Sequence, residues 1–590
     1  MNIVGIHDGH NSSVTIVQNG KVLAACQEER LTRVKNQGGS PVNALHESLR
    51  ISGLGTLDSI DQFVIAGRVS QPPYITRQDV LDDYAYKSMY SKSAMGALRS
   101  VVSDNDLIRN LWLRLQKYQT SSAQRMRSSF LIDEGVPFEK VQFIDHHTAH
   151  ASSAYYGMAN YDERILVLTN DGAGDGLCGT VSIGYEGQLQ RIGQISEDNS
   201  LATIFAMITY MMGMVPLEHE YKIMGLAPYY RGDVKNNKVY QGLVNIFEWD
   251  QETPFLWRRS DHIPRVGYLW KYLENLLHNQ RFDSVAASMQ AYTEMFMVEW
   301  VKRCIRETGV TRVAVAGGTF MNVKANQALL DIPDVEELFV FPSCGDETNS
   351  VGAAYWSYAH SQLSDHKTVN IHKLGSIYWG GEFSDHEIEN VLENFKFNSK
   401  EVIYKKHDNI ESIVAELLST DKVVARFKGR MEFGARALGN RSILAKPSDL
   451  QVVQYINDII KSRDFWMPFA PAVLAEYSDD YFRKNKPISA SYMVMSFDTK
   501  KSKRGDIIAS LHPQDGTARP QEVYSDMNSD FASLLQEYRS ITGEAVLLNT
   551  SFNLHGYPLV YSPLDALNVF NRSGLEYMAL GNYLVSKCEK

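Results

Sequence analysis

The sequence predicts an α/β protein whose N-terminal part contains a duplicated unit. Three strand-like runs follow one another near the start: Asn2–Ile6, Ser13–Gln18 and Lys21–Gln27. An Asn-Gly dipeptide separates the second run from the third, which is a strong hairpin signal. The pattern recurs at residues 164–195, where RILVLT, LCGTVSIGY and QLQRIGQI are separated by NDGAGDG and by Glu-Gly. Two meanders, each with an Asp-Gly loop, indicate duplication, although two unrelated hairpins would give the same pattern.

Later segments extend the α/β pattern to the rest of the chain. RVAVAGG at 312–318 and ELFVFP at 337–342 each run from an apolar strand into a turn and then a helical stretch. Ligands commonly bind at such carboxyl ends of strands. The chain becomes more polar from His366 onward, so we place a boundary there and predict domains at residues 1–370 and 371–590. VVARF and EAVLLNTSF then predict strands of a second α/β unit, which also contains the apolar segment PFAPAVL.

Composition excludes several classes of protein. The 590 residues are 44% hydrophobic and 22% charged, as in ordinary globular proteins, and the net charge is −10. This acidic balance argues against a broad nucleic-acid-binding face. The five cysteines form no CxxC pair, and neither a signal peptide nor a membrane-spanning stretch is recognisable. We therefore expect a cytoplasmic protein that binds neither nucleic acid nor membrane.

Two histidines and two aspartates form a candidate metal site. His146 and His150 are four residues apart in DHHTAHA and so share one face of a helix, whereas His147 points elsewhere. Asp171 in NDGAGDG and Asp346 in SCGDETNS each follow a predicted strand and are candidate further ligands. Mixed His and carboxylate ligation leaves iron, manganese and zinc open. A purely structural histidine pair is the competing interpretation.

Two further regions could bind anions. Gly317, Gly318 and Asn322 lie where a strand leads into a helix, a position suited to anions but also typical of ordinary tight turns. The segment GRMEFGARALGNRSI contains Arg430, Arg436 and Arg441 with a single acid, Glu432. Guanidinium groups near exposed backbone suit phosphate or carboxylate, and no P-loop motif is present. Further polar groups that extend this second candidate site are Lys461, Arg463, Arg519, Asn549, Ser551 and Asn553.

His10 and Lys35 are weaker candidates on their own. His10 lies in the first polar turn, where a neutral imidazole could accept a proton from an alcohol, but a turn histidine is more often simply solvated. Lys35 follows a strand and the sequence EER, a pattern that a surface ion pair would also explain.

Taken in order, these motifs resemble the O-carbamoyltransferase family that includes the nodulation-factor, cephem and nebramycin carbamoyltransferases. The resemblance runs nearly from end to end. It rests on GHNSS, QEERLTRVK, HHTAHA, NDGAGDG, HEYKIMGLAP, GGTFMN, GDETNSVGAA, GRMEFGARALGNRSI, PFAPAV, DGTARPQ and NTSFN. An ordered set of this size is specific, whereas any single member is not.

The resemblance implies a fold and a reaction for each domain. The N-terminal domain would have the duplicated actin-like, ribonuclease-H-like fold, and the C-terminal domain an α/β YrdC-like fold that forms carbamoyl-adenylate. The C-terminal site would convert ATP and carbamoyl phosphate into carbamoyl-adenylate, with Mg²⁺ accompanying ATP. The N-terminal site would transfer the carbamoyl group to a hydroxyl of a small-molecule acceptor, such as a sugar or secondary metabolite. A homodimer is compatible with the family.

Roles carried over from the family attach to individual residues. His146, His150, Asp171 and Asp346 match the metal ligands, and the family's metal is iron(II). His10 matches the catalytic histidine and Lys35 a lysine beside the acyl-adenylate, with Gly317, Gly318 and Asn322 expected to bind the adenylate. The residues that match nucleotide and carbamoyl-phosphate contacts are Arg436, Lys461, Arg519, Asn549 and Ser551.

Departures from the family pattern and rival functions remain. Ala435 stands where the family often has Pro, and Met467 where it often has Arg, which lowers the positive charge near the second site. An actin-like kinase or ATPase would release ADP, and a tRNA-modifying carbamoyl transferase would need a basic face for RNA. The acceptor cannot be read from motifs. Residues 70–135 resemble an insertion that could cover the acceptor pocket, although surface packing is the favoured explanation.

Overall fold

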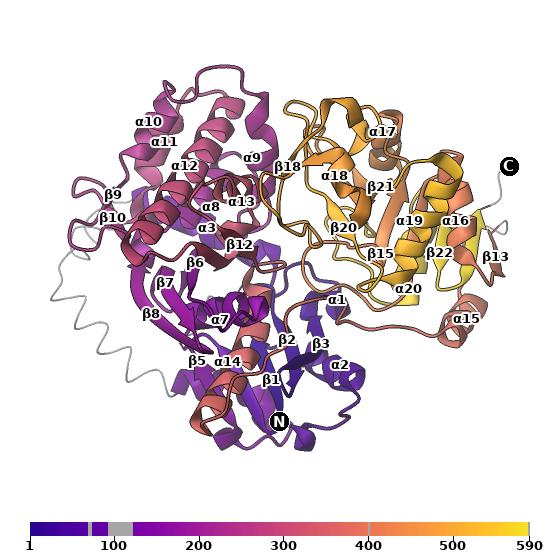
Figure 1. Ribbon diagram of the computed structural model, residues 1–590, viewed down its shortest axis with the longest axis horizontal. Helices are drawn as coiled ribbons and strands as arrows, with labels where there is room; N and C mark the ends of the chain where they lie inside the picture. The colour runs from indigo at the N-terminus through magenta and orange to yellow at the C-terminus, as the bar shows by residue number, and fades with distance from the viewer. Residues whose placement is uncertain (69–73, 93–121, 399–401, 588–590) are drawn as a thin grey trace. The chain divides into compact units, whose positions relative to one another are not determined.

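A computed structural model describes residues 1–68, 74–92, 122–398 and 402–587 (Figure 1). Contacts divide the chain into two compact units. The first unit contains Met1–Glu28 and Asn36–Leu374, and the second unit contains Glu29–Lys35 and Gly375–Lys590. A seven-residue segment from the N-terminal region thus belongs to the second unit. The assignment of separate activities to residues 1–370 and 371–590 stays a prediction, and part of the insertion at 70–135 lies outside the described residues.

The first sheet of the first unit begins with the predicted meander. Its strands are β1 (Asn2–His7), β2 (Ser13–Gln18), β3 (Lys21–Gln27), β4 (Gln62–Ala66) and β5 (Val141–Ile144), in the order β3-β2-β1-β4-β5. The first three strands pair antiparallel, whereas β4 and β5 continue the sheet parallel to β1. Parallel pairing requires crossover connections, and α2 (Val42–Ser52) lies in the connection before β4.

The second sheet repeats this arrangement. Its strands are β6 (Ile165–Gly174), β7 (Leu177–Tyr185), β8 (Gln188–Ser196), β11 (Arg312–Ala316) and β12 (Glu337–Val340). The order is β8-β7-β6-β11-β12, again an antiparallel meander followed by two parallel strands. Equal order and equal strand directions confirm the predicted duplication and the actin-like, ribonuclease-H-like fold class.

Two helices bring the halves of this unit together. α7 (His146–Met158) follows β5, α14 (Asn349–Ser364) follows β12, and the two helices pack against each other (Figure 1). Glycines allow the close approach: a Cβ at Gly352 would lie 1.9 Å from the carbonyl oxygen of Ala149 in α7. A Cβ at Gly5 in β1 would lie 1.9 Å from the carbonyl oxygen of Ser350. Helix α14 therefore rests directly on the first strand.

The first unit contains further helices in the connections between its strands. They include α3 (Arg77–Lys92), α6 (Ser129–Asp133), α8 (Leu201–Met211), α9 (Glu220–Leu226), α10 (Lys238–Val244), α11 (Trp270–Leu277), α12 (Phe282–Thr308) and α13 (Val323–Leu330). A small two-stranded sheet pairs β9 (Phe247–Trp249) with β10 (Trp257–Arg259). Tyr84, Tyr210 and Trp270 form an aromatic cluster with ring centroids 5.7–6.0 Å apart, which anchors α3 to α8 and α11. No helix in the described part of the chain is both long and apolar enough to cross a membrane.

The second unit is a mixed α/β structure around one large sheet. The strands, in spatial order, are β13 (Val402–Lys406), β23 (Tyr583–Lys587), β22 (Tyr577–Leu580), β14 (Val424–Phe427), β15 (Arg441–Ala445), β21 (Val546–Ser551), β16 (Ala470–Leu474) and β20 (Gln521–Val523). A second, smaller sheet contains β17 (Phe482–Arg483), β18 (Phe497–Thr499) and β19 (Thr517–Ala518). The accompanying helices are α15 (Asp385–Asn394), α16 (Ile410–Ser419), α17 (Gln451–Ile456), α18 (Ser478–Tyr481), α19 (Ser529–Thr542) and α20 (Pro563–Arg572). The two predicted strands of this unit are confirmed as β14 and β21, and the apolar segment PFAPAVL contains β16.

Replacing Gly5 with alanine tests the close contact between β1 and α14. The new methyl group would overlap backbone, which cannot rotate away, so we expect Gly5→Ala to lower the free energy of unfolding by about 3 kcal/mol. Gly267→Ala is the matched control, since a Cβ there meets nothing within 4 Å. Chemical denaturation measures both. Equal stability of the two variants would contradict the close packing.

Glu220 at the start of α9 makes stability depend on pH. Burial raises the pKa of its carboxyl to about 7, and the hydrogen bond from Leu217 N (2.7 Å) only partly opposes this. Because the pKa of Glu220 is higher in the folded than in the unfolded state, the contribution of its protonated carboxyl to the free energy of unfolding is fully present below about pH 4.5. This contribution is lost as the pH rises through 7. We expect the free energy of unfolding of Glu220→Gln to rise by about 2 kcal/mol relative to that of wild type as the pH goes from 5 to 8. Parallel stability curves across this range would refute the assignment.

Candidate metal and anion sites

The first candidate site is built on the first turn of α7. Asp145 caps this helix by accepting a hydrogen bond from Thr148 N (2.9 Å), which fixes where the helical phase begins. As predicted, His146 and His150 then lie on one face, with ring centroids 4.8 Å apart. His147 faces the other way, with Nδ1 2.8 Å from Thr169 Oγ1.

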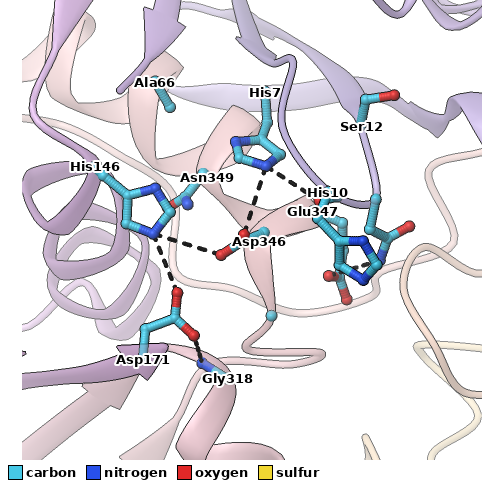
Figure 2. Close-up of polar contacts among 12 residues, drawn as sticks. His7, His10, Ser12, Ala66, His146, Asp171, Gly318, Asp346, Glu347 and Asn349 are labelled. Atoms are coloured by element: carbon cyan, nitrogen blue, oxygen red, sulfur yellow. Dashed lines mark hydrogen bonds and ion pairs between the residues drawn. The ribbon is translucent and has the colours of Figure 1, made fainter. Parts of the chain in front are cut away.

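Asp171 and Asp346 approach these two rings from different elements. Asp171 lies in β6, and Asp346 lies in the connection from β12 to α14. His146 Nε2 is 3.2 Å from Asp171 Oδ2 and 3.5 Å from Asp346 Oδ1. His150 Nε2 is 3.6 and 3.3 Å from the same two oxygens. One donor atom from each of the four residues thus falls within 4.8 Å of the other three, and Figure 2 shows His146 between the two carboxylates.

Asp171 does not lie in a loop, contrary to the expectation from NDGAGDG. β6 continues through Gly174, with an irregular register between Asn170 and Gly174. Such a bulge re-aims side chains and is frequent beside functional sites. The other carboxylate oxygen of Asp171 accepts a hydrogen bond from Gly318 N (3.1 Å), which fixes its orientation (Figure 2).

The charges of the four residues are strongly coupled. Burial alone would lower the pKa of His146, but the carboxylates of Asp346 and Asp171 outweigh it and raise the pKa to about 9. Burial would raise the pKa of Asp171, yet hydrogen bonding to His146 and His150 holds it well below its usual range. The imidazole of His146 and the carboxylate of Asp171 thus favour each other's charged forms.

The donor set fits a divalent transition metal. Two imidazole nitrogens and two carboxylate oxygens suit iron(II), manganese or zinc. Asp346 Oδ1 is buried and accepts no hydrogen bond among the described residues, and its polar neighbours are the Nε2 atoms of His146 and His150 at 3.5 and 3.3 Å. The residues present therefore fit the metal that the family resemblance implies, without deciding which metal it is.

Sequence reasoning missed two neighbours of this cluster. His7, at the end of β1, is fully buried, and its Nε2 is 3.8 Å from Asp346 Oδ2. Asn349 Nδ2 lies 3.2 Å from His150 Nε2. The position of Asn349, three residues after Asp346 at a helix start, was a usable signal. No pattern marked His7, because only the sheet brings the end of β1 to this site.

His10 lies in the loop after β1, and its ring, unlike that of His7, is not directed at Asp346. Its backbone carbonyl accepts a hydrogen bond from His7 Nε2 (3.2 Å). Figure 2 shows the ring of His7 directed at Asp346, whereas the ring of His10 lies on the side of Glu347. His10 Nδ1 is buried with no hydrogen-bond partner among the described residues. Its catalytic role stays a prediction.

The glycine turn after β11 has a structural role. Gly317 has φ +109°, and a Cβ there would lie 2.3 Å from the carbonyl oxygen of Asn170, so only glycine fits. Gly318 N donates to Asp171. Asn322 Oδ1 caps α13 by accepting from Ala325 N (3.1 Å). Adenylate binding by these residues stays a prediction.

The second candidate site, in the second unit, gathers positive charge. Lys461 is 3% exposed, and its Nζ donates to Asn553 Oδ1 (2.6 Å) and Ser551 Oγ (3.0 Å). Burial, Arg463 and Lys35 all lower its pKa well below the usual 10.5. The pKa of Arg519 is likewise well below its usual value, because of burial, Arg436 and Arg463. We call Lys35, Arg436, Lys461, Arg463 and Arg519 the cation cluster.

The cation cluster has the character of an anion-binding site. The charged groups that shift the pKa of Lys461 and Arg519 are all cations. Nε of Arg519 is buried without a hydrogen-bond partner in the described part of the chain. Buried like charges repel one another and cost free energy unless an anion compensates them. The predicted residues Asn549 and Ser551 lie on β21, where Ser551 contacts Lys461 directly and Asn549 donates to Gln521 Oε1 (3.0 Å).

Two of the three arginines grouped in GRMEFGARALGNRSI have a structural role instead. Arg430 donates to the carbonyl oxygen of Trp379 (2.7 Å). Arg441 is fully buried, donates to the carbonyl oxygen of Gly429 (3.0 Å), and stacks on Phe427 at 3.7 Å from the ring centroid. Guanidinium groups satisfy several backbone carbonyls at once, so these two stabilise the glycine-rich loop that carries Arg436.

Comparisons with known proteins assign the family. A family model described as the carbamoyltransferase N-terminus matches residues 2–355, and one described as the carbamoyltransferase C-terminus matches residues 415–587. The chain therefore belongs to the carbamoyltransferase family and is a carbamoyl-transferring enzyme.

Similar proteins match over nearly the whole chain. Nodulation protein NolNO of Sinorhizobium fredii is 29% identical over 98% of this chain and 79% of its own length. An uncharacterised protein of Methanocaldococcus jannaschii is 30% identical over 99% of both chains. Among solved structures, full-length HypF in its phosphate- and nucleotide-bound form matches with a TM-score of 0.34 and 12% identity, over 60% of this chain and 55% of HypF. That structural likeness is too low to add to the family assignment.

Removing one carboxylate tests the metal site directly. We expect Asp346→Asn to weaken divalent-metal affinity by at least about tenfold, because one charged ligand is lost. Titration calorimetry with Mn²⁺ and anaerobic Fe²⁺ measures this without any turnover. His46→Gln, at an exposed histidine outside the cluster, is the control. Unchanged stoichiometry and affinity in Asp346→Asn would exclude these four residues as the ligands.

Proposed function

We propose that the protein is an ATP-dependent O-carbamoyltransferase that works in two half-reactions. In the second unit, carbamoyl phosphate and water give carbamate and phosphate, and the carbamate oxygen attacks the α-phosphorus of ATP to give carbamoyl-adenylate and pyrophosphate. In the first unit, an acceptor hydroxyl attacks the carbamoyl carbon, and AMP leaves. The acceptor is a hydroxylated small molecule, such as a sugar or secondary metabolite.

The observation that carries the proposal is the presence of two chemically different buried sites in a carbamoyltransferase. The cation cluster suits the phosphate groups of ATP and carbamoyl phosphate, since Lys461 and Arg519 lack a compensating acid. The cluster of His146, His150, Asp171 and Asp346 instead suits a cation. A site for anions supports activation, and a site for a metal supports transfer.

Each group in the first unit has a defined task in the proposal. A bound divalent metal, for which iron(II) is our candidate, would act as a Lewis acid toward the phosphate of the adenylate. His10 would accept the proton of the acceptor hydroxyl, since an alcohol is a poor nucleophile at neutral pH. The backbone amides near Gly317 and the side chain of Asn322 would hold the adenylate. Closure of the site to water would protect the labile carbamoyl group.

The test separates the two half-reactions. His10→Asn should keep ATP- and carbamoyl-phosphate-dependent pyrophosphate release but lower acceptor carbamoylation by about 10²- to 10⁴-fold, because only transfer needs the general base. Pyrophosphate is measured by a coupled assay, and carbamoylated product by mass spectrometry against a panel of hydroxylated compounds. Treatment of wild type with a chelator selective for transition metals, with Mg²⁺ kept in excess, should have the same selective effect.

Controls and contrary outcomes follow from the chemistry. His46→Asn, at an exposed histidine, should behave as wild type in both assays. Formation of ADP in place of AMP and pyrophosphate would indicate a kinase or ATPase. Equal loss of both half-reactions in His10→Asn would overturn the role assigned to His10.

A further inference from the structure

The segment Glu29–Lys35 interrupts the first unit and packs into the second. Arg30, which is 4% exposed, donates to the carbonyl oxygen of Gly434 (2.7 Å). Gly434 is two residues before Arg436 in the glycine-rich loop. The segment is thus anchored at one end to the loop that carries a member of the cation cluster.

A second anchor lies at the other side of the same cluster. Arg33 donates to the carbonyl oxygens of Leu559 (2.5 Å) and Pro558 (3.0 Å), and its Nε is 3.5 Å from Asp565 Oδ1. This stretch of chain follows Asn553, the residue that accepts a hydrogen bond from Lys461. The two arginines therefore hold the segment between the two loops that border the cation cluster.

Lys35 follows Arg33 by two residues, so the anchoring of Arg33 brings Lys35 to the same part of the second unit. The charge of Lys35 opposes that of Lys461, and among the described residues the charged groups that shift the pKa of Lys461 are both cations. Placing another cation beside a buried lysine is unfavourable for an empty protein. The arrangement becomes favourable when a multiply charged anion lies among these groups.

We infer that Lys35 is an anion-binding residue of the second unit, so that a segment directly after the N-terminal meander completes the site that binds phosphate groups. The inference rests on the proposed function for the source of these groups, ATP or carbamoyl phosphate. It differs from the role that family resemblance implies for Lys35, beside the acyl-adenylate at the transfer site. Lys35 acts here during activation.

Binding of inorganic pyrophosphate to the full chain tests the inference without turnover. We expect Lys35→Gln to raise the Kd for pyrophosphate by about tenfold, because one charged hydrogen-bond donor is lost, and the difference should shrink with added salt. Lys35→Arg should stay within about threefold of wild type, since it keeps the charge. Lys405→Gln, at an exposed lysine of the same unit, is the matched control. Lys35→Met, which keeps the aliphatic stem, replaces Lys35→Gln if the latter does not fold.

The enzymatic arm identifies the source of the phosphate. Pyrophosphate release is measured while ATP and carbamoyl phosphate are varied separately, and the substrate whose KM rises in Lys35→Gln is the one that Lys35 contacts. If wild type binds pyrophosphate more tightly than Lys35→Gln but releases none from ATP and carbamoyl phosphate, the proposed function fails and the inference stands. If Lys35→Gln binds and releases pyrophosphate as wild type does, and only acceptor carbamoylation falls, the inference is overturned.

Discussion

The organisation of this enzyme depends on buried charge that the protein does not neutralise by itself. In the first unit, two carboxylates and two imidazoles share a space in which donor atoms lie within 4.8 Å of one another. In the second unit, Lys461 and Arg519 lie among other cations. Water cannot screen these charges as it would on the surface. A bound cation would stabilise the first cluster, and a bound anion would stabilise the second. In the proposed mechanism, this difference divides the chemistry between a cation-binding and an anion-binding site.

The folded backbone supports the first of these clusters through close contacts. Helices α7 and α14 can approach because Gly352 offers no side chain, and α14 can lie on β1 because Gly5 offers none. Helix α7 carries His146 and His150, and helix α14 begins three residues after Asp346. The second sheet supplies both carboxylates, with Asp171 on β6 and Asp346 after β12, whereas the two histidines follow β5 of the first sheet.

The second unit is assembled from chain segments far apart in sequence. Lys461, Ser551 and Asn553 come from two separate elements, and the segment Glu29–Lys35 comes from the beginning of the chain. Arg30 and Arg33 of this segment donate to backbone carbonyl oxygens of the second unit. Few other side chains could replace Arg33, because its guanidinium group donates to two of these oxygens at once. This unit therefore cannot be described as the C-terminal part of the chain alone.

The sequence by itself determined the strands of both meanders, their duplication, the shared helical face of His146 and His150, and the four residues of the candidate metal site. These features follow from local periodicity and from motifs, which a chain displays without knowledge of its fold. Only the tertiary structure decided that β6 continues through Asp171 as a bulged strand, that His7 faces Asp346, that Arg430 and Arg441 stabilise a loop, and that Lys35 belongs to the second unit. Each of these depends on pairing or burial between residues distant in sequence, and such contacts leave no periodic signal in either partner.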